Sequence, residues 1–250
     1  MILLQTIYGH KIYLPGGKIP YQEDAIKKYG VYEPATSAAI YRFVKPGMHV
    51  VEAGACCGYH ALNIAKAIGP GGGLSCFEAN PNLVEILSKN LEMNGYRDFA
   101  EVHNMGLWVE EGELPFPLLE WGLGGASFKN PRQLANVPTV QVKTVSLDSF
   151  FANKPVDFIR MDIEGAELEA IKGARSILTE QGPSMILEWI PGNVRANESM
   201  QLYKLLKDLD YYIYRITSDG LKEIARNEDL FSKHVETDDR DILCCKEAAQ

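Results

Sequence analysis

The feature that most constrains the fold of this chain is a repeated alternation of short apolar runs with amphipathic runs of helical spacing. It starts at residues 50–69, VVEAGACCGYHALNIAKAIG, where an apolar pair, a glycine turn and a helical run follow one another. The same order recurs over residues 74–91, 156–178 and 184–209. Strands that alternate with helices in this way are typical of βαβ units. The sequence therefore predicts a parallel sheet.

Three further stretches complete the predicted sheet. Residues 100–109 read as a third strand. Near the end of the chain, residues 211–217 and 240–247 are strand-like with no helix between them, so we expect them to pair antiparallel. The predicted fold is α/β: a Rossmann-like, seven-stranded, mostly parallel sheet with an antiparallel hairpin strand at its end.

The predicted organisation is one core with two additions. A chain of 250 residues is long enough for one sizeable core and short for two. Residues 1–41 are predicted to form a hairpin and a helical lead-in packed on the core, and residues 42–250 the Rossmann-like domain. Residues 110–138 are rich in glycine, proline and aromatic side chains. We expect them to form a lid-like insertion, because long loops within compact domains are often functional.

Charge and cysteine content narrow the class of protein. A formal net charge of −8 argues against nucleic acid as a partner, because nonspecific binding to phosphates needs Lys and Arg. No stretch approaches the roughly 20 apolar residues of a membrane-spanning helix. The five cysteines show no Cys-x-x-Cys spacing. We therefore expect a cytoplasmic protein with reduced thiols and no membrane span. Its oligomeric state is not predicted, and a homodimer is left open.

The glycine turn after the first predicted core strand carries a carboxylate, Glu52, at its lip. Dinucleotide-binding turns follow the pattern Gly-x-Gly-x-x-Gly, whereas here Glu52 precedes Gly54 and Gly58, and no Walker lysine is present. A glutamate in that place would repel a phosphate. The pattern favours a cationic nucleoside ligand without phosphate. S-adenosylmethionine is such a molecule, since it carries adenosine, an ammonium and a sulfonium.

Polar side chains also follow the other predicted strands. Ligands of open parallel sheets bind at the carboxyl ends of the strands. Besides Glu52, the sequence places Glu78, Asn104, Asp162 and Glu188 at or near such ends. The carboxylate of Glu78 can accept hydrogen bonds from both ribose hydroxyls of an adenosine. We therefore expect the nucleoside to lie against Glu78.

Three sequence blocks resemble the FkbM family of S-adenosylmethionine-dependent methyltransferases. They are VVEAGACCGYHAL, CFEANP and VDFIRMDIEGAELEAIKGA, and the last, with its Asp-x-Glu-Gly-x-Glu pattern, is the hallmark. The resemblance covers about residues 32–188, with a matching closing strand near Ile242. It implies a class I methyltransferase fold with S-adenosylmethionine as the cofactor.

The resemblance also implies roles for individual residues. The glycine turn would form the cofactor loop, and Glu78 would hold the ribose. Asp162 and Glu164 would lie beside the transferred methyl, and Glu33 near the amino-acid end of the cofactor. The full predicted cofactor-binding set is Glu33, Glu52, Gly54, Ala55, Cys56, Gly58, Tyr59, Glu78, Ala79, Asn104, Asp162 and Glu164.

Methyl transfer is an in-line displacement, so the protein must chiefly align the acceptor with the methyl group. By resemblance the acceptor is a hydroxyl on a sugar or another small natural-product scaffold, and its proton needs a base. The candidate catalytic residues are Asp162 and Glu188, with His60 as a third choice. No spacing demands a metal ion, and none is assigned. Two alternatives stay open: an NAD-dependent oxidoreductase and a noncatalytic cofactor-binding module.

Overall fold

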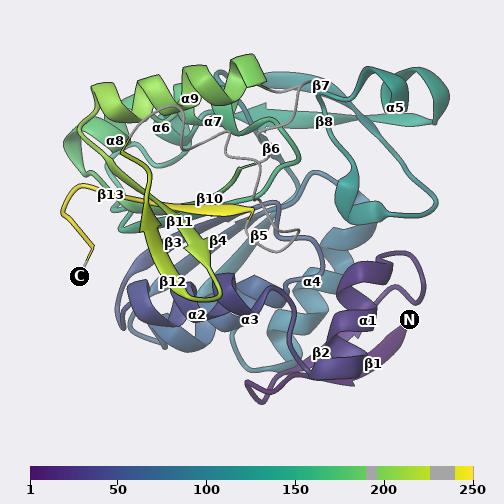
Figure 1. Cartoon of the computed structure of the whole chain (residues 1–250). Helices are drawn as coiled ribbons and strands as arrows, with labels where there is room; N and C mark the ends of the chain where they lie inside the picture. Colours follow the sequence, from purple (N-terminus) through teal and green to yellow (C-terminus); the bar gives the residue numbers. More distant parts are fainter. Residues whose placement is uncertain (190–195, 226–239, 250) are drawn as a thin grey trace.

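The computed structural model describes residues 1–189, 196–225 and 240–249. Its central feature is an eight-stranded sheet with helices on both faces (Figure 1). The strands are β3 His49–Ala53, β4 Gly73–Phe77, β5 Ala100–His103, β9 Phe158–Met161, β10 Ser184–Glu188, β11 Tyr212–Thr217, β12 Gly220–Glu223 and β13 Asp241–Cys245. Their order across the sheet is β12-β11-β13-β10-β9-β3-β4-β5.

The pairing of these strands confirms the predicted fold class. Strands β3, β4, β5, β9 and β10 pair in parallel, and β13 runs antiparallel to both β10 and β11. The sheet has one strand more than the seven predicted. The chain turns back after β11 and pairs antiparallel with it as the short edge strand β12. A run of four residues with two exposed positions gave too weak a pattern to be recognised.

Helices cover the two faces in separate groups (Figure 1). One face carries α1 Pro20–Tyr29, α2 Pro34–Phe43, α3 Tyr59–Ile68 and α4 Pro81–Met93. The other face carries α6 Leu147–Phe150, α7 Glu167–Lys172, α8 Arg175–Glu180 and α9 Ala196–Asp208. Each group buries its own apolar cluster against the sheet, as in other α/β folds. The helices cover the faces of the sheet and leave the carboxyl ends of the parallel strands uncovered, where ligands of such sheets bind.

The N-terminal residues form a hairpin followed by two helices. Strands β1 Ile2–Gln5 and β2 Lys11–Leu14 pair antiparallel. The amide of Asn90 on α4 fastens this hairpin, because it accepts from Tyr13 N at 2.7 Å and donates to Tyr13 O at 2.9 Å. The hairpin is therefore tied to the helix that follows β4.

The segment 110–138, expected as a lid-like loop, has secondary structure of its own. It contains β7 Gly112–Pro117, a short 3₁₀ turn η1 Leu123–Gly125 and α5 Pro131–Asn136. Strand β8 Thr139–Val145 pairs with β7 on one side and with β6 Gly106–Leu107 on the other. Two prolines within β7 hid this strand from the sequence analysis, but proline is tolerated on an edge strand.

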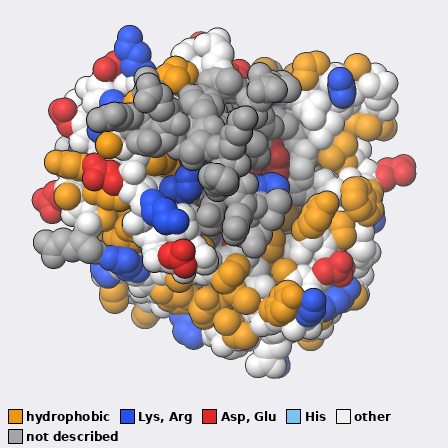
Figure 2. All heavy atoms as spheres, in the orientation of Figure 1, with side chains coloured by type: hydrophobic (Ala, Val, Ile, Leu, Met, Phe, Trp, Pro, Cys, Tyr) orange, Lys and Arg blue, Asp and Glu red, His pale blue; other side chains and the backbone are white. Residues whose placement is uncertain are grey.

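Two observations bear on the predicted partners. None of the helices in the three described ranges is long and apolar enough to cross a membrane. On the face shown in Figure 2, Lys and Arg side chains are interspersed with Asp and Glu. The absence of a nucleic-acid partner stays a prediction.

Candidate active site

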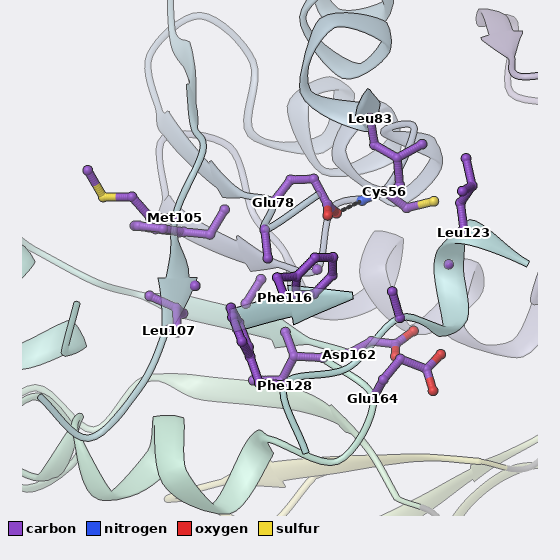
Figure 3. A pocket seen from close by; sticks show the side chains of 18 residues that line it. Cys56, Glu78, Leu83, Met105, Leu107, Phe116, Leu123, Phe128, Asp162 and Glu164 are labelled. Carbon is purple, nitrogen blue, oxygen red and sulfur yellow. Dashed lines mark hydrogen bonds between the residues drawn. The ribbon is translucent and has the colours of Figure 1, made fainter. Parts of the chain in front are cut away.

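A pocket lies at the carboxyl ends of β3, β4 and β9 and is walled by the β7–α5 insertion. It encloses about 550 Å³, part of it open to solvent. Phe116 and Phe128 from the insertion line the pocket together with Glu78 and the acid pair Asp162 and Glu164 (Figure 3). Six of the predicted cofactor-binding residues line this pocket: Gly54, Cys56, Glu78, Ala79, Asp162 and Glu164.

The glycine turn after β3 is shaped by two close approaches. Gly54 has a φ of +76°, and a Cβ atom there would lie 1.8 Å from the carbonyl oxygen of Asp162. Gly58, which precedes α3, has a φ of +91°, and a Cβ atom there would lie 2.7 Å from a methyl carbon of Leu87. Only glycine fits such positions without strain. The turn is therefore pressed against the chain that follows β9.

Glu78 follows β4 and turns its carboxylate toward the backbone of the glycine turn (Figure 3). One oxygen accepts from Cys56 N and the other from Asn80 N, both at 2.7 Å. Burial raises the pKa of Glu78 to about 7, although these amide donors pull it down. Each carboxylate oxygen can accept a second hydrogen bond. The side chain is therefore fixed in place with capacity for two hydroxyl donors.

The loop after β9 contributes two acids, Asp162 and Glu164, to the lining of the pocket. Glu164 has a left-handed backbone with a φ of +56°. Glu167, at the start of α7, accepts from Ile163 N at 3.0 Å and from Gly165 N at 3.2 Å. These two hydrogen bonds fix the loop to the first turn of α7. Ser127 of the insertion donates to the carbonyl oxygen of Glu164 at 2.8 Å. The loop is thus held from both sides, and Glu167 shapes it.

Glu188, at the end of β10, lies close to these acids. Oxygens of Asp162, Glu164 and Glu188 are all within 4.8 Å of one another. Burial and the neighbouring carboxylates raise the pKa of Glu188 well above its usual range. Its Oε2 atom is buried without a hydrogen-bond partner within the described parts of the chain. Carboxylate oxygens at such distances are ligands that Mg²⁺ and Ca²⁺ prefer. The absence of a metal stays a prediction.

Glu188 also lines a second, smaller cavity. This cavity encloses about 340 Å³ and lies between α7, the end of β10 and α9. Its walls include the indole of Trp189, the side chain of Leu202 and the carboxylate of Glu198. The cluster of three acids therefore lies between two cavities, since Asp162 lines the first and Glu188 the second.

A buried arginine lies behind the pocket. Arg160, on β9, is 3% exposed and ion-pairs with Glu52 at 3.2 Å, with Asp162 at 2.9 Å and with Glu33 at 3.6 Å. These carboxylates raise the pKa of Arg160 against the effect of burial. Burial raises the pKa of Glu52 to about 8, although Arg160 opposes this. His60 and Arg160 hold the pKa of Glu33 at about 2 against the effect of burial.

Several predicted site residues lie behind the pocket and do not line it. Glu52 is 1% exposed and faces Arg160, so it is not at the lip of the turn. His60 is 4% exposed, and its Nε2 atom pairs with Glu33 at 2.8 Å. Asn104 donates to the carbonyl oxygens of Glu78 and Ala79 and so supports that turn. The other predicted cofactor-binding residues that do not line the pocket are Glu33, Ala55, Gly58 and Tyr59.

Comparison with known proteins identifies the family. The model of the methyltransferase FkbM domain matches residues 52–213. This chain belongs to the FkbM methyltransferase family. The family predicted from the sequence is confirmed, and membership goes against the NAD-dependent oxidoreductase alternative.

Individual relatives of this FkbM-family protein are more distant. A protein-L-isoaspartate O-methyltransferase from Methanothrix thermoacetophila is 36% identical over 73 residues, 29% of this chain and 35% of that protein. The match thus spans about a third of that relative's length. Methyltransferase sdnD of Sordaria araneosa is 25% identical over 198 residues, 66% of this chain and 74% of that protein. The O-methyltransferase from Bacillus cereus, solved in complex with S-adenosylhomocysteine, has the same fold, with a TM-score of 0.53, 16% identity and 94% of each chain covered.

The sequence analysis missed Arg160 as a site residue of this FkbM-family chain. A signal was present, because Arg160 interrupts an otherwise apolar run, Phe158–Met161. A charged residue within a central strand is buried, and a buried charge needs a partner. Glu52, at the end of another predicted strand, was one candidate partner. Reading the two together would have moved Glu52 from the rim of the pocket to its support.

Proposed function

We propose that the protein transfers a methyl group from S-adenosylmethionine to a hydroxyl of a small molecule, a saccharide or another natural-product scaffold. The observation that carries the proposal is the arrangement of the first pocket. A buried carboxylate, Glu78, lies at one end, aromatic walls lie in the middle, and a group of acids lies at the other end, next to a second cavity.

The donor set of the first pocket fits this cofactor. Glu78 has capacity for two ribose hydroxyls, and the apolar side chains of Leu83, Met105 and Phe116 suit an adenine ring. Asp162 and Glu164 suit the cationic sulfonium and ammonium groups. A pyrophosphate would find carboxylates at both ends of the pocket, and these would repel it. The pocket therefore favours a phosphate-free, cationic adenosine derivative.

Glu188 is the best-placed base for a hydroxyl acceptor. The cofactor supplies a methyl group on a sulfonium, which the acceptor oxygen attacks in line. A base must take the hydroxyl proton within hydrogen-bond reach during this step. Glu188 combines a raised pKa with an unpaired oxygen within the described chain, and it opens on the second cavity. Asp162 is held by Arg160, and His60 pairs with Glu33 away from both cavities.

The second cavity supports a small hydroxylated acceptor. Its walls combine an indole, Trp189, with a carboxylate, Glu198, and a hydroxyl, Ser199. Aromatic faces beside polar groups suit molecules that carry both C–H faces and hydroxyls.

The acidic surface disfavours polyanions such as nucleic acid. We further propose, as the sequence predicts, that the protein is cytoplasmic, that the reaction needs no metal ion and that residues 110–138 act as a lid.

The test has two stages. Calorimetric titration with S-adenosylhomocysteine and, separately, with NAD⁺ measures which of the two the pocket binds. A screen of saccharides and phenols with S-adenosylmethionine then measures methyl transfer by mass. We expect binding of S-adenosylhomocysteine and a product heavier by one methylene. Binding of NAD⁺ alone would overturn the cofactor assignment, and methylation at nitrogen or carbon alone would overturn the hydroxyl acceptor.

A further inference from the structure

Arg160 carries a charge where the fold does not need one. It lies on β9 in the middle of the sheet, and its side chain is 4% exposed. Removing such a charge from water costs several kcal/mol, and a buried ion pair often adds no more stability than apolar residues of the same size. Three carboxylates nevertheless surround it: Glu33, Glu52 and Asp162. Stability alone therefore does not account for Arg160.

The register of the sheet explains what Arg160 joins. Glu52 on β3 and Arg160 on β9 are direct partners in adjacent parallel strands. Asp162 follows Arg160 by two residues, so both side chains leave the strand on the same face. One guanidinium nitrogen, Nη1, contacts Glu52 Oε1, and the other, Nη2, contacts Asp162 Oδ2. The planar guanidinium thus bridges a buried carboxylate and a pocket carboxylate.

The two carboxylates differ in what they face. Glu52 is 1% exposed and does not line the pocket, so it serves as the fixed end of the bridge. Asp162 is 22% exposed and lines the pocket. Glu33 adds a second hold on the guanidinium at 3.6 Å, from the start of α2. The guanidinium of Arg160 and its anchor Glu52, which together hold the Asp162 side chain, therefore lie outside the pocket lining.

We propose that Arg160 is a positioning residue, which uses Glu52 as its anchor to fix the carboxylate of Asp162 for the bound cofactor. The inference rests on the proposed function, in which Asp162 contacts the cationic end of S-adenosylmethionine. A fixed carboxylate binds such a group without first losing rotational freedom, which is the benefit of preorganisation. The bridge needs the two-pronged geometry of arginine, which a lysine ammonium does not have.

The test is a double-mutant cycle on cofactor binding. Arg160→Lys, Asp162→Asn and the double variant are titrated with S-adenosylhomocysteine, and their thermal unfolding midpoints are recorded. Arg175→Lys, an exposed arginine on α8, is the matched control. We expect each single variant to bind about tenfold more weakly, and the double variant to bind within about threefold of Asp162→Asn, because contacting residues couple. The control should bind as the wild type does.

The alternatives give different results. If Arg160 serves only to neutralise buried acids, lysine restores that charge, and Arg160→Lys binds S-adenosylhomocysteine normally, which would overturn the inference. The inference would also be overturned if the affinity loss of the double variant equalled the product of the two single-variant losses. If Arg160→Lys does not fold, Glu52→Gln is measured in its place: a tenfold loss supports the inference, and an unchanged affinity overturns it. A wild-type protein that fails to bind S-adenosylhomocysteine would overturn the proposed function itself.

Discussion

If Glu78 holds the cofactor ribose as proposed, its buried position should make cofactor affinity depend on pH. Burial raises its pKa to about 7, and two backbone amides hold its oxygens. Ribose hydroxyls donate to a carboxylate more strongly than to a protonated carboxyl group. The cofactor should therefore bind the ionised form and displace the proton. We predict that the affinity for S-adenosylhomocysteine rises as the pH increases through about 7.

The size of the effect follows from the ionised fraction. With a pKa of about 7, Glu78 is ionised in roughly a tenth of free molecules at about pH 6 and in roughly nine tenths at about pH 8. Apparent affinity scales with the competent fraction, so the dissociation constant should be about tenfold higher at the lower pH, or about 1.4 kcal/mol.

The stability of the free protein should change in the opposite direction. The folded-state pKa of Glu78 lies above the ordinary value of 4.5, so the folded protein holds a proton that the unfolded chain releases. Its contribution to the free energy of unfolding therefore decreases as the pH rises from 4.5 to about 7. Stronger binding at higher pH would consequently not reflect a more stable protein.

Calorimetric titration at three pH values, in two buffers of different ionisation enthalpy, measures both the affinity and the protons released. Glu78→Gln removes the titrating group and nearly keeps its shape. It should abolish the pH dependence and weaken binding at about pH 8 by about 1.5–3 kcal/mol, the value of a charged hydrogen bond. Glu85→Gln, exposed on α4, is the control. A wild-type affinity that is flat across this range, or a slope that persists in Glu78→Gln, would refute the reasoning.

Three further predictions concern Gly54, Glu188 and the cluster of three acids. Gly54→Ala should lower the free energy of unfolding by about 2–5 kcal/mol in denaturant titration, because it combines a left-handed backbone with a Cβ clash against Asp162; an unchanged midpoint would contradict the close approach. Glu188→Gln should reduce the methyl-transfer rate about 10²-fold with little change in S-adenosylhomocysteine affinity, whereas an equal loss of both would indicate a binding role. Transfer rates with EDTA and with added Mg²⁺ should agree within about twofold, because Arg160 already neutralises one of the three candidate ligands; a rate lost in EDTA and restored by Mg²⁺ would establish a metal site.

The sequence predicted the sheet because apolar periodicity is a local property. The runs that became β3, β4, β9 and β10 were each recognisable within a few residues, and strand ends predict where ligands bind. The positions of Glu78 and Asp162 at strand ends that line a pocket were therefore predictable without a structure. The insertion was harder, because β7 depends on pairing with β8, a partner more than twenty residues away, and its prolines argued against a strand.

The arrangement behind the pocket could not be predicted from charges considered one at a time. Glu52 was expected at the rim because a strand-end carboxylate is usually exposed to solvent. Its actual surroundings depend on which strand lies beside β3, and β9 is more than a hundred residues away along the chain. Register then decides that Arg160 faces Glu52. Such pairings follow from strand order, which local patterns do not contain.

The contact between Gly54 and the carbonyl of Asp162 separates two demands on the protein. Both partners are backbone, and Asp162 N also donates to Ala53 O at 3.0 Å, so their spacing does not depend on neighbouring side chains. Substitutions around Trp189 and Leu202 can therefore change the second cavity while the donor end keeps its geometry. Under the proposed function, acceptor preference can then drift, or be redesigned, without rebuilding the site that binds the methyl donor.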